Sequence, residues 1–315
     1  MADYPTQEER LKEITDQLEK GIGELFQSGR YAEYLAVMAK FHNYSYGNIL
    51  LIMTQCPSAS QVAGYNDWKR KFGRQVKRFE KGIKILAPCP YKQRIETPKL
   101  DKATQKPIIG ADGQPEMSVQ EVKKTYYKVV TVFDVQQTTG KPLPELASEL
   151  NGEVAGFEKL LAKLIDISPM PVEFSEIKGS AKGYCSYLEQ RIVVKADMSQ
   201  TQTLKTLVHE ICHAKCHNPE ALAEVDSKNR QTREVEAESV AYVVCQNLGI
   251  DTADYSFGYI AGWSANKELP ELKASLAFIR SQAAEIIDSI KLKPPVKERA
   301  APQPEQKPKK AEIGR

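Results

Sequence analysis

The chain has 315 residues, of which 41% are hydrophobic and 27% charged, and its formal net charge at pH 7 is +3. This length suffices for two domains, and the small net charge means that a nucleic-acid surface must be a local cluster. The longest apolar run, residues 49–53, is far too short to span a bilayer, so we expect no membrane contact. The N-terminus shows no secretory signal and the six cysteines show no framework spacing, which predicts a cytoplasmic location.

Residues 1–140 are expected to form a domain of helices and a small antiparallel sheet. Thr6 and Glu9 make a capping-box pattern, which predicts that an amphipathic helix begins there. The other elements expected in this domain are helices at 31–41, 46–56 and 65–72, a hairpin of strands 74–79 and 83–88 turning at 80–82, a mobile loop at 99–120, a strand at 126–135 and a linker at 140–144.

Residues 145–290 are expected to form a second domain, so that the whole chain is α+β. An apolar helical pattern from Val154 to Ile165 precedes three short strands, and a further helix begins near Thr203 and ends near residues 218–219. The three strands are expected at 172–177, 183–188 and 191–195. Residues 291–315 are rich in proline and lysine, which indicates a disordered basic tail.

The most informative motif is HExxH at residues 209–213, inside an apolar helical run. Side chains four residues apart share one face of a helix, so His209 and His213 can present two imidazoles to a single metal ion. Glu210 then lies beside the ion, where it can act as a general base toward water. A second stripe of this helix is apolar and can face a core; it consists of Leu204, Leu207 and Ile211.

A third ligand is expected from the helix that covers residues 232–244. At about 100° per residue, Glu234 and Glu238 lie at the edge of its buried face, whereas Glu236 points nearly the other way and is expected in solvent. A carboxylate at the margin of a buried face is costly unless a cation receives it. We therefore assign Glu234 as the third ligand and Glu238 as the group that orients a ligand histidine, and the reverse assignment stays open. The buried face itself comprises Ala237, Val240, Ala241, Val244 and Leu248.

Two imidazoles and one carboxylate favour Zn²⁺, although manganese, cobalt or nickel could occupy such a site in vitro. A competing interpretation is a closed structural site built from Cys212, His213, Cys216 and His217, which have the same spacing. That alternative leaves Glu210 and the glutamate helix unexplained.

The segment from Lys69 to Lys84 is basic and aromatic, with Glu80 as its single acid. Cations that follow phosphates, together with flat rings that stack on bases, are typical of proteins that bind single-stranded nucleic acid. The alternative is a solvated basic face with the tryptophan in the core. The candidate binding residues are Tyr44, Tyr46, Trp68, Lys69, Arg74, Lys77, Arg78 and Lys81.

Both halves of the chain resemble one family, the ArdC-type antirestriction proteins of conjugative plasmids and related mobile elements. In the N-terminal half the resemblance rests on FHNYSYGNILL (residues 41–51), VAGYNDW (62–68), GRQV (73–76), EKGIKI (80–85) and VFDV (132–135). In the C-terminal half it rests on the HExxH motif, REVEAESVAYVV (233–244) and YIAGW (259–263). It implies a single-stranded-DNA-binding domain followed by a minimal gluzincin-like metallopeptidase domain, in a protein that protects incoming DNA from restriction.

The expected chemistry is hydrolysis of a peptide bond, in which Glu210 takes a proton from water at the metal and returns it to the leaving amine. Tyr259 is a candidate partner for the oxyanion, with a core position as the alternative. Two rival functions stay open. One is a DNA-coating protein with a structural or inactive zinc domain, and the other is a regulatory metalloprotease that cleaves a repressor-like protein substrate.

Overall fold

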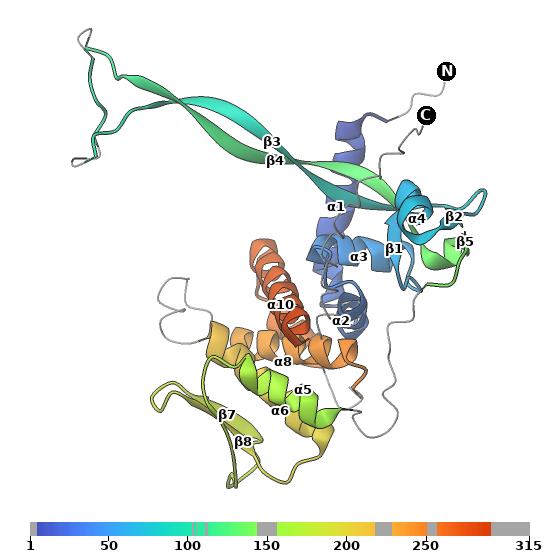
Figure 1. Ribbon diagram of the computed structural model, residues 1–315, viewed down its shortest axis with the longest axis vertical. Coiled ribbons are helices and arrows are strands. Elements are labelled where there is room, and N and C mark those ends of the chain that lie inside the picture. Colours follow the sequence, from blue (N-terminus) through green and yellow to red (C-terminus); the bar gives the residue numbers. More distant parts are fainter. Residues whose placement is uncertain are drawn as a thin grey trace, which may run out of the picture.

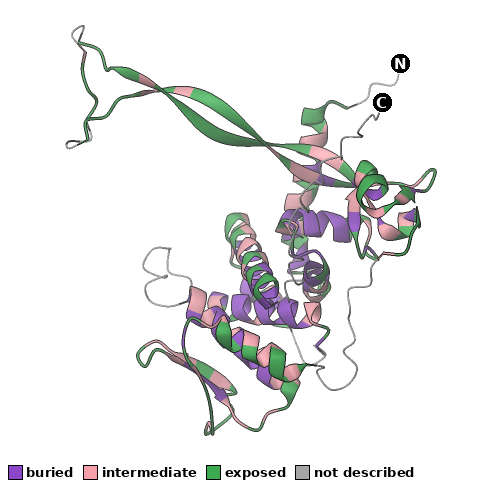
Figure 2. Cartoon of the chain, viewed as in Figure 1, coloured by how far each residue is buried: buried purple, intermediate pink, exposed green. Residues whose placement is uncertain are grey.

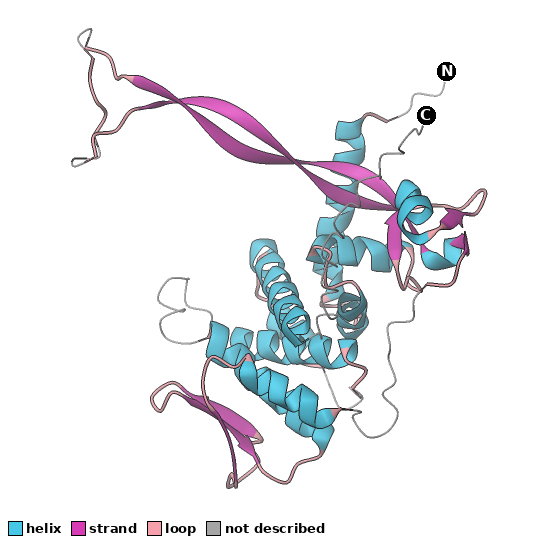
Figure 3. Cartoon of the chain, in the orientation of Figure 1, coloured by secondary structure: helices cyan, strands magenta, loops and turns pink. Residues whose placement is uncertain are grey.

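Figures 1 and 3 show a body of packed helices, a long two-stranded ribbon that projects from it at the top of the view, and a small sheet at the bottom. The structure, a computed structural model, describes residues 5–102, 104, 106–110, 113–143, 156–217, 229–250 and 257–290. The α+β class is confirmed. None of the described helices combines the length and apolarity that crossing a bilayer requires.

The N-terminal helices form where the sequence predicts them. Thr6 accepts a hydrogen bond from the Glu9 backbone and Glu9 accepts one from the Thr6 backbone, so the expected capping box is present. Ser45 caps the third helix by accepting from the Asn48 backbone. The four helices are α1 (Gln7–Leu25), α2 (Tyr31–Lys40), α3 (Tyr46–Gln55) and α4 (Tyr65–Phe72).

The hairpin expected at residues 74–88 is wrong, because its two strands find partners much later in the chain. β2 (Arg74–Val76) pairs with β5 (Thr138–Gly140), and β3 (Ile83–Pro98) pairs with β4 (Met117–Asp134). Phe79 has a left-handed backbone, with φ 64°, which interrupts any strand running on from β2. The expected loop at 99–120 is also shorter than predicted, since β4 already begins at Met117. The remaining N-terminal strand is β1 (Val62–Gly64), which pairs with the end of β4.

Side chains of α3 hold the base of the ribbon. The Asn48 amide donates to the Leu86 carbonyl and accepts from the Leu86 N–H, at 2.8 and 2.9 Å. Gln55 makes the same pair of bonds with the Lys84 backbone. These amides take the place of a neighbouring strand, so the backbone groups on the outer edge of β3 are satisfied where the ribbon leaves the body.

The three strands expected in the C-terminal half are present as a mixed sheet of order β6-β8-β7, in which β7 is an edge strand.

A long C-terminal helix, α10, was missed, although its apolar residues recur at helical spacing and are buried. Val154 and the expected tail lie outside the described residues. The elements of this half are α5 (Phe157–Asp166), β6 (Val172–Ser175), β7 (Gly183–Ser186), β8 (Arg191–Lys195), α6 (Gln200–Cys216), α8 (Arg230–Asn247), α9 (Ile260–Ser264) and α10 (Leu269–Ile290).

One hydrophobic core runs through both halves of the chain. The Tyr31 hydroxyl of α2 lies 2.9 Å from the Ser239 hydroxyl of α8, both buried. The ring of Phe26 contacts that of Trp263, with centroids 5.6 Å apart. Figure 2 shows this buried zone where α2 meets α8 and α10, whereas the ribbon is exposed along most of its length. The helix that carries the HExxH motif, α6, and its neighbour α8 therefore pack in one body with the N-terminal helices.

Trp68 is a core residue, so its assignment as a DNA-stacking ring is wrong. Its side chain is fully buried and its indole N–H donates to the Phe133 carbonyl at 2.8 Å. The ring also packs against Phe72, with centroids 4.9 Å apart. On α4, the apolar face turns to the sheet and leaves the basic residues outside.

We predict that Trp68→Ala lowers the free energy of unfolding by about 3–5 kcal/mol, because it leaves a large cavity and an unpaired carbonyl. Lys69→Ala, at the neighbouring exposed position, should change it by less than about 0.5 kcal/mol. Chemical denaturation of the two variants beside the wild type measures both values. Near-native stability of Trp68→Ala would contradict the burial.

Candidate metal centre

Helix α6 presents the motif residues along one side and packs its other side into the core. Ser199 caps its first turn by accepting from the Gln202 backbone. The expected apolar stripe of Leu204, Leu207 and Ile211 is fully buried. His209 and His213 lie on the opposite side, with 13–18% of their side chains exposed. The burial of the stripe thus directs both imidazoles toward a cleft.

The structure brings His209, His213 and Glu234 together. The two imidazole Nε2 atoms are 3.0 Å apart, and a Glu234 oxygen lies 3.5 and 3.7 Å from them. Two nitrogen ligands of a tetrahedral zinc ion are separated by about 3.3 Å, given metal–nitrogen distances of about 2.0–2.1 Å. The donor atoms of the three residues all lie within 4.8 Å of one another. The set therefore fits one divalent ion.

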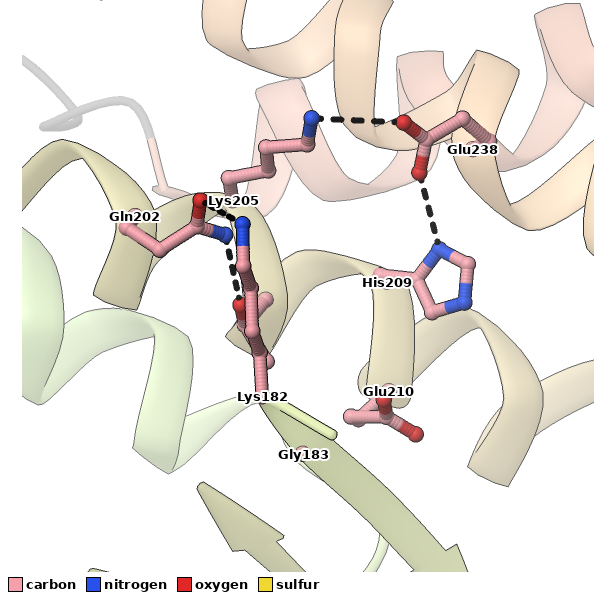
Figure 4. Close-up of a pocket in the computed structure, with 8 residues that line it drawn as sticks. Lys182, Gly183, Gln202, Lys205, His209, Glu210 and Glu238 are labelled. Atoms are coloured by element: carbon pink, nitrogen blue, oxygen red, sulfur yellow. Dashed lines mark hydrogen bonds and ion pairs between the residues drawn. The ribbon is translucent and has the colours of Figure 1, made fainter. Parts of the chain in front are cut away.

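Glu238 lies behind His209, away from the Nε2 atoms. Its carboxylate is 3.4 Å from His209 Nδ1 and 3.3 Å from Lys205 Nζ, as Figure 4 shows. An acid that contacts the far nitrogen of a ligand imidazole fixes the ring orientation and raises its basicity. Glu238 is accordingly placed to orient His209, and Glu234 is the acid placed to ligate the ion.

The prediction that Glu236 is solvated is wrong. Its side chain is fully buried, where it lies 3.3 Å from His217 Nε2 and accepts from the Ser275 hydroxyl at 2.9 Å. His217 Nδ1 in turn lies 3.0 Å from His213 Nδ1. We call His217, Glu236 and Ser275 the buried network. Helical periodicity could not reveal it, because the missed helix α10 packs on the side of α8 that was expected to face water.

Each ligand histidine is therefore used in the same way. Nε2 faces the candidate ion, and Nδ1 is supported from behind, by Glu238 for His209 and by the buried network for His213.

The competing site of two cysteines is not supported. Among the residues that the structure describes, the group close enough to share an ion is His209, His213 and Glu234. Cys212 instead packs in the core, as its apolar flank predicts.

The electrostatics of the centre distinguish its acids. Burial alone would lower the pKa of His209, but contacts with Glu234 and Glu238 outweigh it and raise that pKa to about 9. Hydrogen bonds with the two imidazoles hold the pKa of Glu234 well below its usual range. Burial raises the pKa of Glu210, although both histidines oppose the shift. Glu234 is thus a carboxylate throughout, whereas Glu210 has the greater proton affinity that a general base requires.

The centre opens into a cleft of about 440 Å³ between α6, α8 and β7. Gly183 lets β7 lie against α6, since a Cβ there would meet Thr206 Cγ2 at 2.6 Å and Glu210 Cγ at 3.3 Å. The Tyr187 hydroxyl donates to the His213 carbonyl at 2.9 Å and so ties the chain beyond β7 to the metal helix. The residues that line the cleft are Gly183, Tyr184, Cys185, Tyr187, His209, Glu210, His213, Arg230, Arg233 and Glu234.

Tyr259 lies beside the acids of the centre instead of in the core. Its side chain is 44% exposed. Burial of the hydroxyl, with Glu238 and Glu234 nearby, raises its pKa to about 12. The phenol therefore keeps its proton at neutral pH and can donate a hydrogen bond.

The candidate DNA-binding residues divide into two groups. Arg74 is bound to the β5 backbone and the Thr138 hydroxyl, Lys77 donates to the Gln136 carbonyl, and Tyr44 donates to the Val62 carbonyl. With the partly buried Tyr46 these residues serve the fold. The exposed candidates are Lys69, Lys77, Arg78 and Lys81, of which Lys77 contacts the Gln136 carbonyl, and Phe79 is exposed among them.

Comparison with protein families now identifies the two halves. The family model of the N-terminal domain of anti-restriction factor ArdC matches residues 5–133, and that of the IrrE N-terminal-like peptidase domain matches residues 165–247. This chain is an ArdC-type two-domain protein. The candidate metal ligands and Glu210 fall within the second match.

Two kinds of relative accompany the family matches. The ArdC-type chain is 30% identical over 307 residues to an uncharacterized protein of Bacillus anthracis. The match covers 90% of this chain and 51% of that relative, so this chain spans about half the length of the relative. The Mn(II)-bound crystal structure of antirestriction protein ArdC from plasmid R388 has a TM-score of 0.51 at 18% identity, covering 89% of this chain and 96% of that one. At this identity the likeness shows a shared fold.

We predict that metal binding to the ArdC-type chain releases about one proton at pH 7, because His209 is protonated below pH 9 and must be neutral to ligate. Affinity should rise about tenfold per pH unit up to pH 9 and level off above it. Calorimetric titration with Zn²⁺ in buffers of different ionisation enthalpy measures the proton count. An affinity that does not change between pH 6 and 8 would contradict it.

We also predict that Glu236→Gln weakens metal binding by about 10- to 100-fold, because His217 loses the charge that orients it toward His213. The matched control is Glu271→Gln on the exposed first turn of α10, which should bind as the wild type does. Competition with a metallochromic chelator gives both affinities. Equal affinities for Glu236→Gln and the wild type would show that the buried network serves the fold alone.

Proposed function

We propose that this chain is an antirestriction protein of a mobile genetic element, that it binds single-stranded DNA, and that it carries a zinc-dependent site of the metallopeptidase type. The convergence of His209, His213 and Glu234, with Glu210 at the next helical position, carries the proposal for the site. Two imidazoles, one carboxylate and an adjacent general base are the donor set of gluzincin-type hydrolases.

Different residues of the cleft would serve different steps of peptide hydrolysis. A divalent ion at this site supplies Lewis acidity and makes a bound water more acidic. Glu210, with its raised pKa, takes a proton from water and delivers it to the leaving nitrogen. Tyr259 holds a proton at neutral pH and is available to donate to the developing oxyanion. Glu238 and the buried network keep both imidazoles oriented.

The edge strand β7 supports a peptide as the substrate class. β7 pairs with β8 on one side only and lies along the metal helix. An extended peptide can add to such an edge through backbone hydrogen bonds, which would align it with Glu210. Arg230 and Arg233 line the same cleft. The substrate would therefore lie extended between β7 and α8.

The exposed loop after β2 supports binding of DNA in the N-terminal half. Phe79 is fully exposed and has a left-handed backbone, a conformation that is rare and costly for an aromatic residue and that clusters at functional sites. Arg78 and Lys81 flank it, and Lys69 extends the basic surface on α4. An exposed ring among cations suits the stacking and phosphate contacts of a single strand. The antirestriction role rests on the family of the N-terminal domain.

We predict that Glu210→Gln retains metal but loses antirestriction activity, because the variant keeps all three ligands and lacks the base. The measurement is the transfer of an unmodified conjugative plasmid into restricting and non-restricting hosts that express each variant, with metal content determined on the purified proteins. Glu189→Gln, an exposed acid in the β7–β8 turn, is the matched control and should protect as the wild type does.

The rival functions give different results in the same assay. Full protection by Glu210→Gln would identify a DNA-coating protein whose metal domain is structural. Cleavage of a repressor-like protein that continues after Arg78→Glu and Lys81→Glu would favour a regulatory metalloprotease. Equal zinc content in Glu234→Ala and the wild type would overturn the choice of third ligand.

A further inference from the structure

The ribbon of β3 and β4 is the most exposed regular element of the chain. Its strands have 16 and 18 residues, so at about 3.3 Å per residue the ribbon is roughly 50 Å long. Only its base is anchored, by β1 and by the amides of α3. Beyond the base it extends away from the helical body, as Figures 1 and 2 show. A ribbon of this length without a core behind it exposes both of its faces.

The middle of the ribbon exposes three tyrosine rings. Tyr91, Tyr126 and Tyr127 have 44%, 55% and 53% of their surface accessible. Cross-strand partners share a face and successive residues alternate between faces. The register therefore places Tyr91 and Tyr126 on one face, where their centroids are 5.9 Å apart, and Tyr127 on the other. Rings that are exposed on both faces leave flat surfaces on which the bases of a ligand can stack.

The same section of the ribbon is purely basic. Residues 84–93 and 122–133 include no aspartate or glutamate. Lys124 pairs with Tyr91 across the strands, and Lys128 lies two residues beyond Tyr126 on the same face. Lys123 shares the opposite face with Tyr127 and with Lys92, whose charge is paired with Glu121 just beyond this section. No carboxylate of the described residues forms an ion pair with any of the three lysines of β4, Lys123, Lys124 and Lys128.

The outer edge of β3 is closed to a further strand. The N–H groups of Lys84 and Leu86 point away from β4, toward α3. Pro88 and Pro90 continue the same alternation, so the outer edge has no N–H to donate at these positions. Proline on an edge prevents pairing with a protein strand. A partner strand is therefore excluded from the outer edge of β3 at these positions, and the faces of the ribbon, where the rings and lysines lie, stay open to a partner.

We propose that the middle of the ribbon is a binding platform for single-stranded DNA, with bases stacked on Tyr91, Tyr126 and Tyr127 and phosphates contacted by Lys123, Lys124 and Lys128. This rests on the proposed function and adds a second surface to the Phe79 loop. Unpaired bases expose the flat faces that stack on tyrosine, whereas in a duplex those faces are covered by their neighbours. The combination of rings and cations thus selects a single strand over a duplex.

The test is fluorescence anisotropy of a labelled oligothymidylate with the full-length protein. Tyr91→Ala with Tyr126→Ala should weaken binding at least tenfold, whereas the same two positions changed to Phe should bind as the wild type, because stacking needs the ring and not the hydroxyl. Lys123→Glu, Lys124→Glu and Lys128→Glu together should flatten the dependence of log affinity on log salt by about 0.7 for each phosphate that the protein no longer neutralises. Leu188→Ala, at a highly exposed position in the other half, is the control and should have no effect.

The outcomes separate this inference from the function on which it rests. If the wild-type protein binds no single-stranded oligonucleotide, the DNA half of the proposed function fails. If it binds, and only Arg78→Glu with Lys81→Glu weakens binding, the ribbon proposal is overturned while the proposed function stands. Equal or tighter binding of a duplex overturns the ribbon proposal as well. Photo-crosslinking of bromodeoxyuridine DNA to the unaltered protein, mapped by mass spectrometry, must find the ribbon tyrosines even if the variants fold poorly.

Discussion

Three carboxylates on one buried helix organise the metal centre. α8 is packed between α2, α6 and α10, and it carries Glu234 and Glu238 one turn apart on one side and Glu236 on the opposite side. A buried acid without a partner is strongly destabilising, which applies to the sealed Glu236, whereas the side chains of Glu238 and Glu234 are 26% and 52% exposed. Glu234 faces two imidazoles, Glu236 meets His217 and Glu238 meets His209 with Lys205. The acids therefore determine where the histidines point before any ion arrives.

The two ligand histidines are supported by different surroundings. His209 depends on Glu238, whose side chain is about a quarter exposed, and on the charge of Lys205. His213 depends on His217 and Glu236, which are sealed from solvent. Salt screens exposed charges far more than buried ones, so the two halves of the site respond unequally to ionic conditions. The position of His213 is fixed by the core, and that of His209 is set by the cleft.

The sequence was sufficient for most of the elements that depend on local periodicity, with α10 as the exception. The four N-terminal helices, the short strands and the HExxH helix follow from spacing and capping residues such as Thr6 and Ser45. Pairings across long separations were missed, since nothing near residue 76 indicates that its partner strand begins at residue 138. Exposure was misjudged for the same reason. Trp68 and Glu236 are buried by elements distant in sequence, β4 and α10, which helical angle counting cannot include.

The shared core joins Tyr31 and Phe26 of the N-terminal half to Ser239 and Trp263 of the C-terminal half. This contact limits how such proteins can evolve. Each half contributes apolar side chains to this shared core, and these side chains would be exposed to water if the half were alone. Recombination could therefore not transfer one half to another protein without further substitutions. A lineage that replaces one half with a domain from another protein would first have to change the residues of this shared core. The ArdC-type N-terminal half and the peptidase-like C-terminal half of this chain thus depend on one common core.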